Sequence, residues 1–455
     1  MELSFLFEDR KFFRELFRIA VPITIQNLAL ASLNLVDTII IGGLGEVAIA
    51  SVGLANQYFF LLNLLLFGIA SGSSIFTAQY WGSKDIPNIK RVLGLCLLTG
   101  GAGALIFTIG GLLFPEQILS IFSKDAQVIT LGGQYLRIIV FSYVITAFSF
   151  AFSFTLRSTG QVKVPMVVSM IALSINTILN YGLIYGYFGL PKLGIQGSAI
   201  ATLIARIVEL LLILAIIYGR KMVIAAGFNE LFSLPPAFMA RFFKVTLPVI
   251  LNESIWALGV TMYAVAYAHM GTQVIASTNI SGTVERIVWV LFMGFGNACG
   301  VMLGNSIGAG KEKEVFKMAK RFIILGPAAA VLAGGLMILL SGFMLSAYNV
   351  SPTVHVFAQK NLMVYSCFLW AKVFNYIAVV GILRSGGDTK FCLFLDSCGV
   401  WLVGVPMAFL GGLVWHLPIY FVYALVNMEE VFKIAFGLPR ILSKKWINNL
   451  TVESA

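Results

Sequence analysis

The sequence predicts an all-α membrane protein whose twelve transmembrane helices form two pseudo-symmetric six-helix lobes around a central cavity. Three observations lead to this fold class: the apolar composition, the number of long apolar segments, and an internal repeat. Of the 455 residues, 59% are hydrophobic and 11% are charged, whereas soluble proteins average about 45–50% and about 25%. This composition excludes a soluble globular protein, a disordered chain and a secreted disulfide scaffold.

Twelve segments have the length and apolar character that a helix needs to cross a bilayer, which is about 20 residues. They lie at residues 16–43, 47–78, 92–114, 133–156, 163–187, 196–219, 244–268, 279–306, 321–347, 362–383, 391–413 and 419–440. The first segment follows a charged amphipathic stretch, Glu8 to Arg18, without a small-residue cleavage site. We therefore expect no removable signal peptide.

The basic residues predict the topology. With the N-terminus inside the cell, the chain ends and the loops after helices 2, 4, 6, 8 and 10 carry 24 Lys and Arg, and the opposite side carries only Lys124, Lys192 and Lys360. Positive charge concentrates on the cytoplasmic side of membrane proteins. We therefore expect a multi-pass protein of the cell membrane with both termini in the cytoplasm, and the net charge of +11 does not indicate nucleic-acid binding.

An internal repeat relates the two halves of the chain. A shift of 226 residues aligns nine identities, among them Pro22 with Pro248 and Gly45 with Gly271, and a shift of 227 aligns Leu156-Arg157-Ser158 with Leu383-Arg384-Ser385. Each half holds six predicted helices, so both copies have the same orientation in the membrane. We expect an N-lobe at residues 1–219, a cytoplasmic linker at 220–243, and a C-lobe with a cytoplasmic tail at 244–455.

The order of several motifs resembles the multidrug and toxic compound extrusion (MATE) family over nearly the whole chain. The motifs are Pro22, Asp37 and Gly42-Gly43 on helix 1, Thr77–Gly82, Leu156–Gly160, Asn176 with Asn180–Ile184 on helix 5, Gly197–Thr202 opening helix 6, Gly304–Lys311 and Leu383–Lys390. The resemblance implies a secondary transporter with two six-helix lobes.

An ionisable side chain inside a bilayer costs roughly 2.5–3.5 kcal/mol and marks a candidate functional site. Asp37 lies in an apolar run on helix 1, while Asn176 and Asn180 are four residues apart and share a face of helix 5. Together with Thr202 on helix 6, they offer carboxylate, amide and hydroxyl oxygens suited to a hard monovalent cation. The resemblance implies a cation or proton site at these four positions. Some family branches have a second carboxylate where this chain has Asn180, so the identity of the ion stays open. The alternative is a purely structural hydrogen-bond network.

The second half offers a further set of candidates for the substrate cavity. Glu253 with Trp256, and Glu285 with Trp289, each place a carboxylate near an aromatic ring on one helix, which suits an organic cation. Gln57 is a polar residue in the apolar run of helix 2. The remaining candidates share a face of helix 10 and are Lys372, Asn375 and Tyr376. The structural alternative is a buried cluster joining Glu253, Glu285, Arg286 and Lys372. The position equivalent to Asp37 holds Tyr263, so we expect ion coupling mainly in the N-lobe.

Arg206 and Glu209 are three residues apart on helix 6 and can form an ion pair. The sequence shows no Walker A motif, nucleophile elbow or metal-binding Cys/His pattern. We therefore expect neither an enzyme nor a cofactor, and no metal ion other than Na⁺ at Asp37.

Together these features predict a monomeric antiporter that exports amphiphilic, often cationic organic compounds in exchange for Na⁺ or H⁺ by alternating access of the two lobes. Its partners would be a small organic substrate and the lipid bilayer, and not nucleic acid. The main alternative is a lipid or lipid-linked oligosaccharide flippase of the same superfamily, which predicts extra helices and a more basic cavity. A channel or receptor would need neither the repeat nor the buried carboxylate, and a membrane enzyme would need a catalytic constellation.

Overall fold

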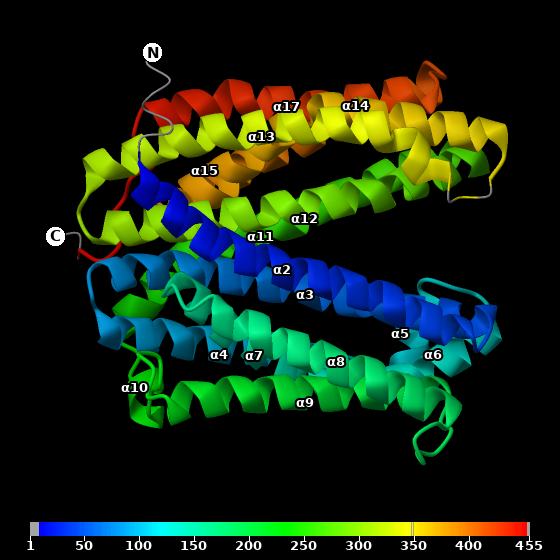
Figure 1. The fold of residues 1–455 in the computed structure, drawn as a ribbon, viewed down its shortest axis with the longest axis horizontal. Coiled ribbons are helices and arrows are strands. Elements are labelled where there is room, and N and C mark those ends of the chain that lie inside the picture. Colours follow the sequence, from blue (N-terminus) through cyan, green and yellow to red (C-terminus); the bar gives the residue numbers. More distant parts are fainter. Residues whose placement is uncertain (1–8, 347, 349, 453–455) are drawn as a thin grey trace. The chain divides into compact units, whose positions relative to one another are not determined.

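The computed structural model is nearly all helical and describes residues 9–346, 348 and 350–452, apart from the side chains of residues 33–35 (Figure 1). The helices of the first half are α2 (Arg10–Gly42), α3 (Glu46–Gly82), α4 (Ile86–Leu113), α5 (Pro115–Ser120), α6 (Ala126–Ile139), α7 (Phe141–Ser158), α8 (Lys163–Tyr185), α9 (Ile195–Gly219) and α10 (Phe228–Phe232). All six spans predicted in this half coincide with helices, the fourth being formed by α6 and α7, which meet at a bend of 49°.

The second half continues with α11 (Pro236–His269), α12 (Thr272–Gly308), α13 (Glu312–Ser346) and α14 (Pro352–Tyr376), which runs on into the π-helix η1 (Ile377–Leu383). The next span combines α15 (Thr389–Cys398), η2 (Gly399–Gly404), α16 (Val405–Phe409) and η3 (Leu410–Val414), and α17 (Ile419–Leu442) is the last. Among the described residues, ten helices are long and apolar enough to cross a membrane, and the bent pair supplies an eleventh. Charged residues make α17 less apolar, although it coincides with the twelfth predicted span. Residue 347, at the end of the predicted span 321–347, lies outside the described part. The prediction of an all-α membrane fold is confirmed.

Local sequence signals account for several helix ends. Asp125 caps α6, because its carboxylate accepts the backbone N–H of Gln127 at 2.9 Å. Ser351 caps α14 in the same way, and Pro352 follows it at the first helical position. Gly186 ends α8 with a left-handed backbone at φ 82°, a conformation that glycine adopts without steric cost.

The contacts divide the chain into two compact units, Ile25–Ile250 in one and Met1–Thr24 with Leu251–Ala455 in the other. Two helices are therefore shared between the units, α2 between Thr24 and Ile25 and α11 between Ile250 and Leu251. These two points differ by the 226 residues of the sequence repeat. The lobes predicted at residues 1–219 and 244–455, and the linker between them, stay a prediction.

The backbone repeats its special conformations at the same offset. Gly45 and Gly271 precede α3 and α12 with φ of 101° and 121°, and Gly160 and Gly387 have φ of 77° and 75°. A side-chain contact is repeated as well, although a repeat of the sequence does not by itself require a repeated contact. Gln26 donates to Ser169 at 2.8 Å, and the equivalent residues of the second half, Asn252 and Asp396, form the same contact at 2.9 Å. The repeat is therefore a structural one.

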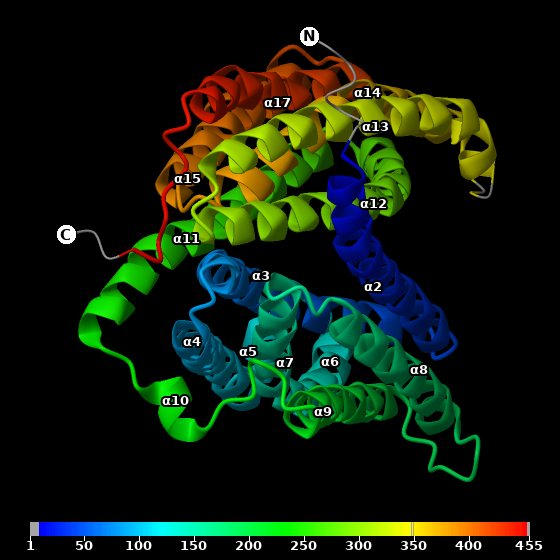
Figure 2. The same cartoon turned by 60° about the vertical axis from the view of Figure 1, so that its left-hand side comes forward.

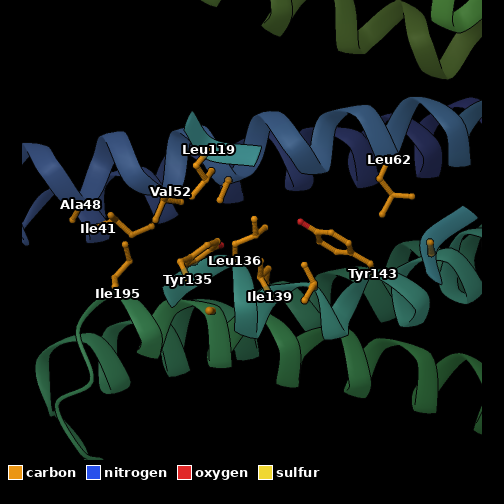
Figure 3. Close-up of a cluster of buried hydrophobic side chains, with 14 of the residues drawn as sticks. Ile41, Ala48, Val52, Leu62, Leu119, Tyr135, Leu136, Ile139, Tyr143 and Ile195 are labelled. Carbon is orange, nitrogen blue, oxygen red and sulfur yellow. The ribbon is translucent and has the colours of Figure 1, made fainter. Parts of the chain in front are cut away.

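A hydrophobic core organises the first unit around α3, α6 and α7. Figure 3 shows its side chains, including Leu62 on α3, Leu136 on α6 and Tyr143 on α7, all of which are fully buried. Ile40 and Ile41 extend this cluster to the end of α2. Packing of these residues fixes the last turns of α2 against the rest of the unit.

The segment after α9 packs back onto the first unit. Figure 2 shows α10 lying beside α4, and Glu230 of α10 forms an ion pair with Lys90 of α4 at 2.7 Å. The hydrogen bond from Lys90, together with one from the backbone of Gly227, holds the pKa of Glu230 below its ordinary value. This segment is thus part of the unit Ile25–Ile250.

Helices α8 and α9 lie side by side (Figure 1). Their close packing limits which residues position 197 can hold. A Cβ atom at this position would lie 2.6 Å from the carbonyl oxygen of Leu183 on α8. We expect Gly197→Val to destabilise the protein by about 1–3 kcal/mol, because the helices must move apart, and to lower the unfolding temperature of the purified protein. Gly53→Val is the matched control, since nothing lies within 4 Å of a Cβ atom at Gly53. Equal unfolding temperatures for the two variants would contradict this account.

Candidate functional site

The end of α2 carries the first candidate, Asp37. Three residues further on, the backbone oxygen of Ile40 accepts a hydrogen bond from the Tyr185 hydroxyl at 2.6 Å. This bond ties the last turns of α2 to α8, and the core packing of Ile40 and Ile41 supports it. Asp37 thus lies one turn before a packed end of α2, and its side chain is partly buried.

The structure brings the four predicted cation-site residues together in two contacts. The amide of Asn180 donates to the Asp37 carboxylate at 2.8 Å, which joins α2 to α8. The amide of Asn176 donates to the Thr202 hydroxyl at 3.1 Å, which joins α8 to α9. Because Asn176 and Asn180 are one turn apart on α8, both contacts lie on one face of this helix.

Two buried oxygens at this site have no hydrogen-bond partner among the residues that the structure describes. They are the side-chain carbonyl oxygens of Asn176 and Asn180, residues that are 2% and 0% exposed. Nearly all buried polar atoms in proteins find a partner, so each exception needs an explanation. With the Asp37 carboxylate and the Thr202 hydroxyl, these oxygens form a donor set suited to a hard cation such as Na⁺. The role of the four residues as ion ligands stays a prediction.

A chain of polar contacts runs beside this site. Arg206 forms the predicted ion pair with Glu209 at 2.7 Å, and Glu209 accepts a hydrogen bond from Ser169 at 2.9 Å. Gln26 donates to Ser169 at 2.8 Å and accepts from Arg157 at 2.6 Å. The contacts link α2, α7, α8 and α9 within one unit.

The acidic candidates of the second half have partners that the sequence did not indicate. Glu253 pairs with Arg384 at 2.7 Å, and Glu285 accepts from the Tyr423 hydroxyl at 2.8 and 2.9 Å. Lys372 pairs with Glu430 at 3.2 Å. Glu253, Glu285, Arg286 and Lys372, all of them described, form no ion pair with one another, and Glu285 interacts with Lys372 and Arg286 only electrostatically.

The sequence interpretation missed a charged cluster on α17. Glu429, Glu430 and Lys433 are 5%, 7% and 4% exposed. The ammonium of Lys433 lies 3.5 Å from the Asp396 carboxylate and 3.6 Å from that of Glu429. Lys433 is among the 24 Lys and Arg that the sequence assigns to the cytoplasmic ends and loops, whereas the structure buries its side chain. The available signal was its place inside the predicted span 419–440, four residues after Glu429.

The remaining cavity candidates fall into three groups. Asn375 donates to the Glu430 carboxylate at 2.7 Å and therefore belongs to the cluster on α17. Trp289 and Tyr376 contact each other edge to face, with ring centroids 5.2 Å apart. Gln57 on α3 and Trp256 on α11 are exposed. That these residues line a substrate cavity stays a prediction.

Comparisons with known proteins agree with this architecture. The MatE family model matches residues 22–182 and 248–410, one segment in each half of the repeat. The chain is 27% identical over 398 residues to the probable multidrug resistance protein YoeA of Bacillus subtilis, covering 86% of this chain and 84% of that protein. It is 22% identical over 438 residues to the probable multidrug resistance protein NorM of Thermotoga maritima, covering 95% and 93% of the two chains.

A solved structure shows the same fold. The Vibrio cholerae MATE transporter VcmN superposes with a TM-score of 0.87 at 18% identity, covering 96% of this chain and 98% of that one. The two-lobe fold predicted from the repeat is thus confirmed, and proteins of this family are transporters and not enzymes. The family match over both repeats shows that this multi-pass membrane protein belongs to the MatE family of transporters.

Proposed function

We propose that this protein is a multidrug exporter that couples the efflux of amphiphilic, often cationic organic compounds to the entry of Na⁺ or H⁺. The observation that carries the proposal is the site on α2, α8 and α9. There a carboxylate, Asp37, lies next to two buried amide oxygens that have no hydrogen-bond partner in the described part of the chain. The names of the relatives YoeA and NorM, both called probable multidrug resistance proteins, support the substrate class.

In the proposed cycle, Asp37 holds the coupling ion while the amide oxygens of Asn176 and Asn180 and the Thr202 hydroxyl complete its coordination. If the ion is H⁺, Asp37 carries it as a protonated carboxyl group and the amides act only as hydrogen-bond partners. Coupling requires that the ion and the organic substrate have different affinities for the inward- and outward-open conformations. The prolines inside α2 and α11, Pro22 and Pro248, are the proposed bending points. No cofactor other than the coupling ion is proposed.

The proposal can be tested with purified protein in liposomes loaded with a fluorescent organic cation. Efflux is measured under an inward Na⁺ gradient, under an inward H⁺ gradient, and without a gradient, with protein-free liposomes as the control. We expect one of the two gradients to accelerate efflux, and that gradient identifies the coupling ion. Equal efflux in all three conditions would contradict coupled export.

We further propose that both termini lie in the cytoplasm and that the protein works as a monomer. The concentration of Lys and Arg in alternate loops supports the orientation. A protease site added at the C-terminus should be cut in inside-out vesicles and protected in intact cells. The opposite pattern would contradict the orientation, and a dimer in light-scattering measurements would contradict the monomer.

A further inference from the structure

Both halves of the chain carry a basic residue at the same repeat position, but its partner differs. Arg206 on α9 and Lys433 on α17 are separated by the offset of 227 residues. Arg206 forms its ion pair with Glu209, three residues further along its own helix, at 2.7 Å. Lys433 instead lies between the carboxylates of Asp396 and Glu429, at 3.5 and 3.6 Å.

The difference follows from the residues at the surrounding repeat positions. Phe436 stands where the first half has Glu209, so Lys433 has no acidic partner there. Glu429 replaces Thr202, and it accepts a hydrogen bond at 2.5 Å from Tyr263, which replaces Asp37. The repeat positions of Asn176 and Asn180 hold Val403 and Met407, so the second half lacks both amides and has the Lys433 ammonium beside the Glu429 carboxylate.

The first half also contains a basic side chain, Arg206, that could neutralise the Asp37 carboxylate. Arg206 interacts electrostatically with Asp37. The Tyr135 hydroxyl of α6 is a further titratable group that interacts electrostatically with this carboxylate. Asp37 nevertheless receives its hydrogen bond from the neutral amide of Asn180. Glu209 is 5% exposed, and the hydrogen bond from Ser169 fixes its carboxylate. It therefore offers Arg206 a rigid partner.

We propose that Glu209 is a positioning residue: it holds the Arg206 guanidinium away from Asp37 and so leaves the Asp37 carboxylate available to the coupling ion. In the second half, where Phe436 occupies this position, the Lys433 ammonium takes the place of the ion. The inference rests on the proposed function of Asp37. It explains the proposed restriction of ion exchange to the first half by the presence of Glu209 there and of Phe436 at the same repeat position in the second half.

The test measures efflux of the fluorescent cation from liposomes as a function of the coupling-ion concentration. In Glu209→Gln, the released Arg206 side chain should neutralise Asp37. We expect the half-maximal ion concentration to rise about tenfold or more, with the maximal rate at saturating ion largely retained. In the double variant Glu209→Gln with Arg206→Gln, the internal cation is gone, and we expect the half-maximal concentration to return close to the wild-type value.

Two outcomes would overturn the proposal. The first is an unchanged half-maximal concentration in Glu209→Gln, and the second is a shift that the double variant does not reverse. If Glu209→Gln is not monodisperse after purification, Glu209→Asp provides the test, since its shorter carboxylate holds Arg206 less well and should give a smaller rise. Gradient dependence that survives in Asp37→Asn would instead refute ion coupling at Asp37, on which this inference rests, and equal efflux of the wild type with and without a gradient would refute the proposed function, so these failures can be told apart.

Discussion

Replacing Asp37 by Asn is expected to abolish ion-driven efflux while leaving the protein folded. The change removes the negative charge that would bind Na⁺ or carry a proton, but the new amide can still form a hydrogen bond with Asn180, which now bonds to Asp37 at 2.8 Å. In liposomes with an imposed gradient, the efflux rate should fall to that of the same protein without a gradient. Passive exchange of the fluorescent cation should persist, because in the proposed cycle the Asp37 carboxylate holds the coupling ion and not the organic substrate.

Asp125→Asn is the matched control for this experiment. Asp125 is exposed at the start of α6 and caps it, and Asn caps helices about as well as Asp, so transport should not change. Asp37→Glu should retain part of the coupling because it keeps the charge. Gradient-driven efflux by Asp37→Asn at the wild-type rate would refute ion coupling at this site.

Replacing Lys433 by Met is expected to produce the largest loss of stability. Lys433 is 4% exposed, and its ammonium balances the carboxylates of Asp396 and Glu429. Removing one partner of a buried ion pair costs about 3–5 kcal/mol, because the remaining charge is left without compensation. Thermal unfolding of the purified protein should therefore begin at a clearly lower temperature than in the wild type.

Two further variants identify the cause of this loss. Lys433→Arg keeps the positive charge and should unfold close to the wild-type temperature. Adding Asp396→Ser to Lys433→Met removes one of the unbalanced carboxylates and introduces the residue found at the repeat position Ser169, so part of the stability should return. An unfolding temperature of Lys433→Met equal to that of the wild type would show that this ammonium does not stabilise the cluster.

The sequence predicts the fold well because apolar length and the repeat are properties of the chain itself. Each of the twelve apolar segments coincides with helical structure. Gly45 and Gly271, which the repeat aligns, both have a positive φ angle. Contacts within one helix follow from spacing in the same way. The three-residue separation of Arg206 and Glu209 predicts the ion pair that the structure contains.

Contacts between helices were less accessible to prediction. Spacing places Asn176 and Asn180 on one face of a helix, but it cannot show that α2 and α9 lie against that face; the family resemblance supplied this. For Glu253, the partner is Arg384, 131 residues away, and no periodicity points to it. The buried charges of α17 were overlooked because basic residues near the end of the chain were attributed to the cytoplasmic side.

The central proposal is that Asp37 holds the coupling ion and gives it up when the organic substrate binds. It is tested most directly by adding the fluorescent cation to purified protein and measuring the Na⁺ or H⁺ released into weakly buffered solution. The account predicts release from the wild-type protein and none from Asp37→Asn, although both bind the cation. Equal ion release from the two proteins, or substrate binding by the wild type without any release, would contradict it.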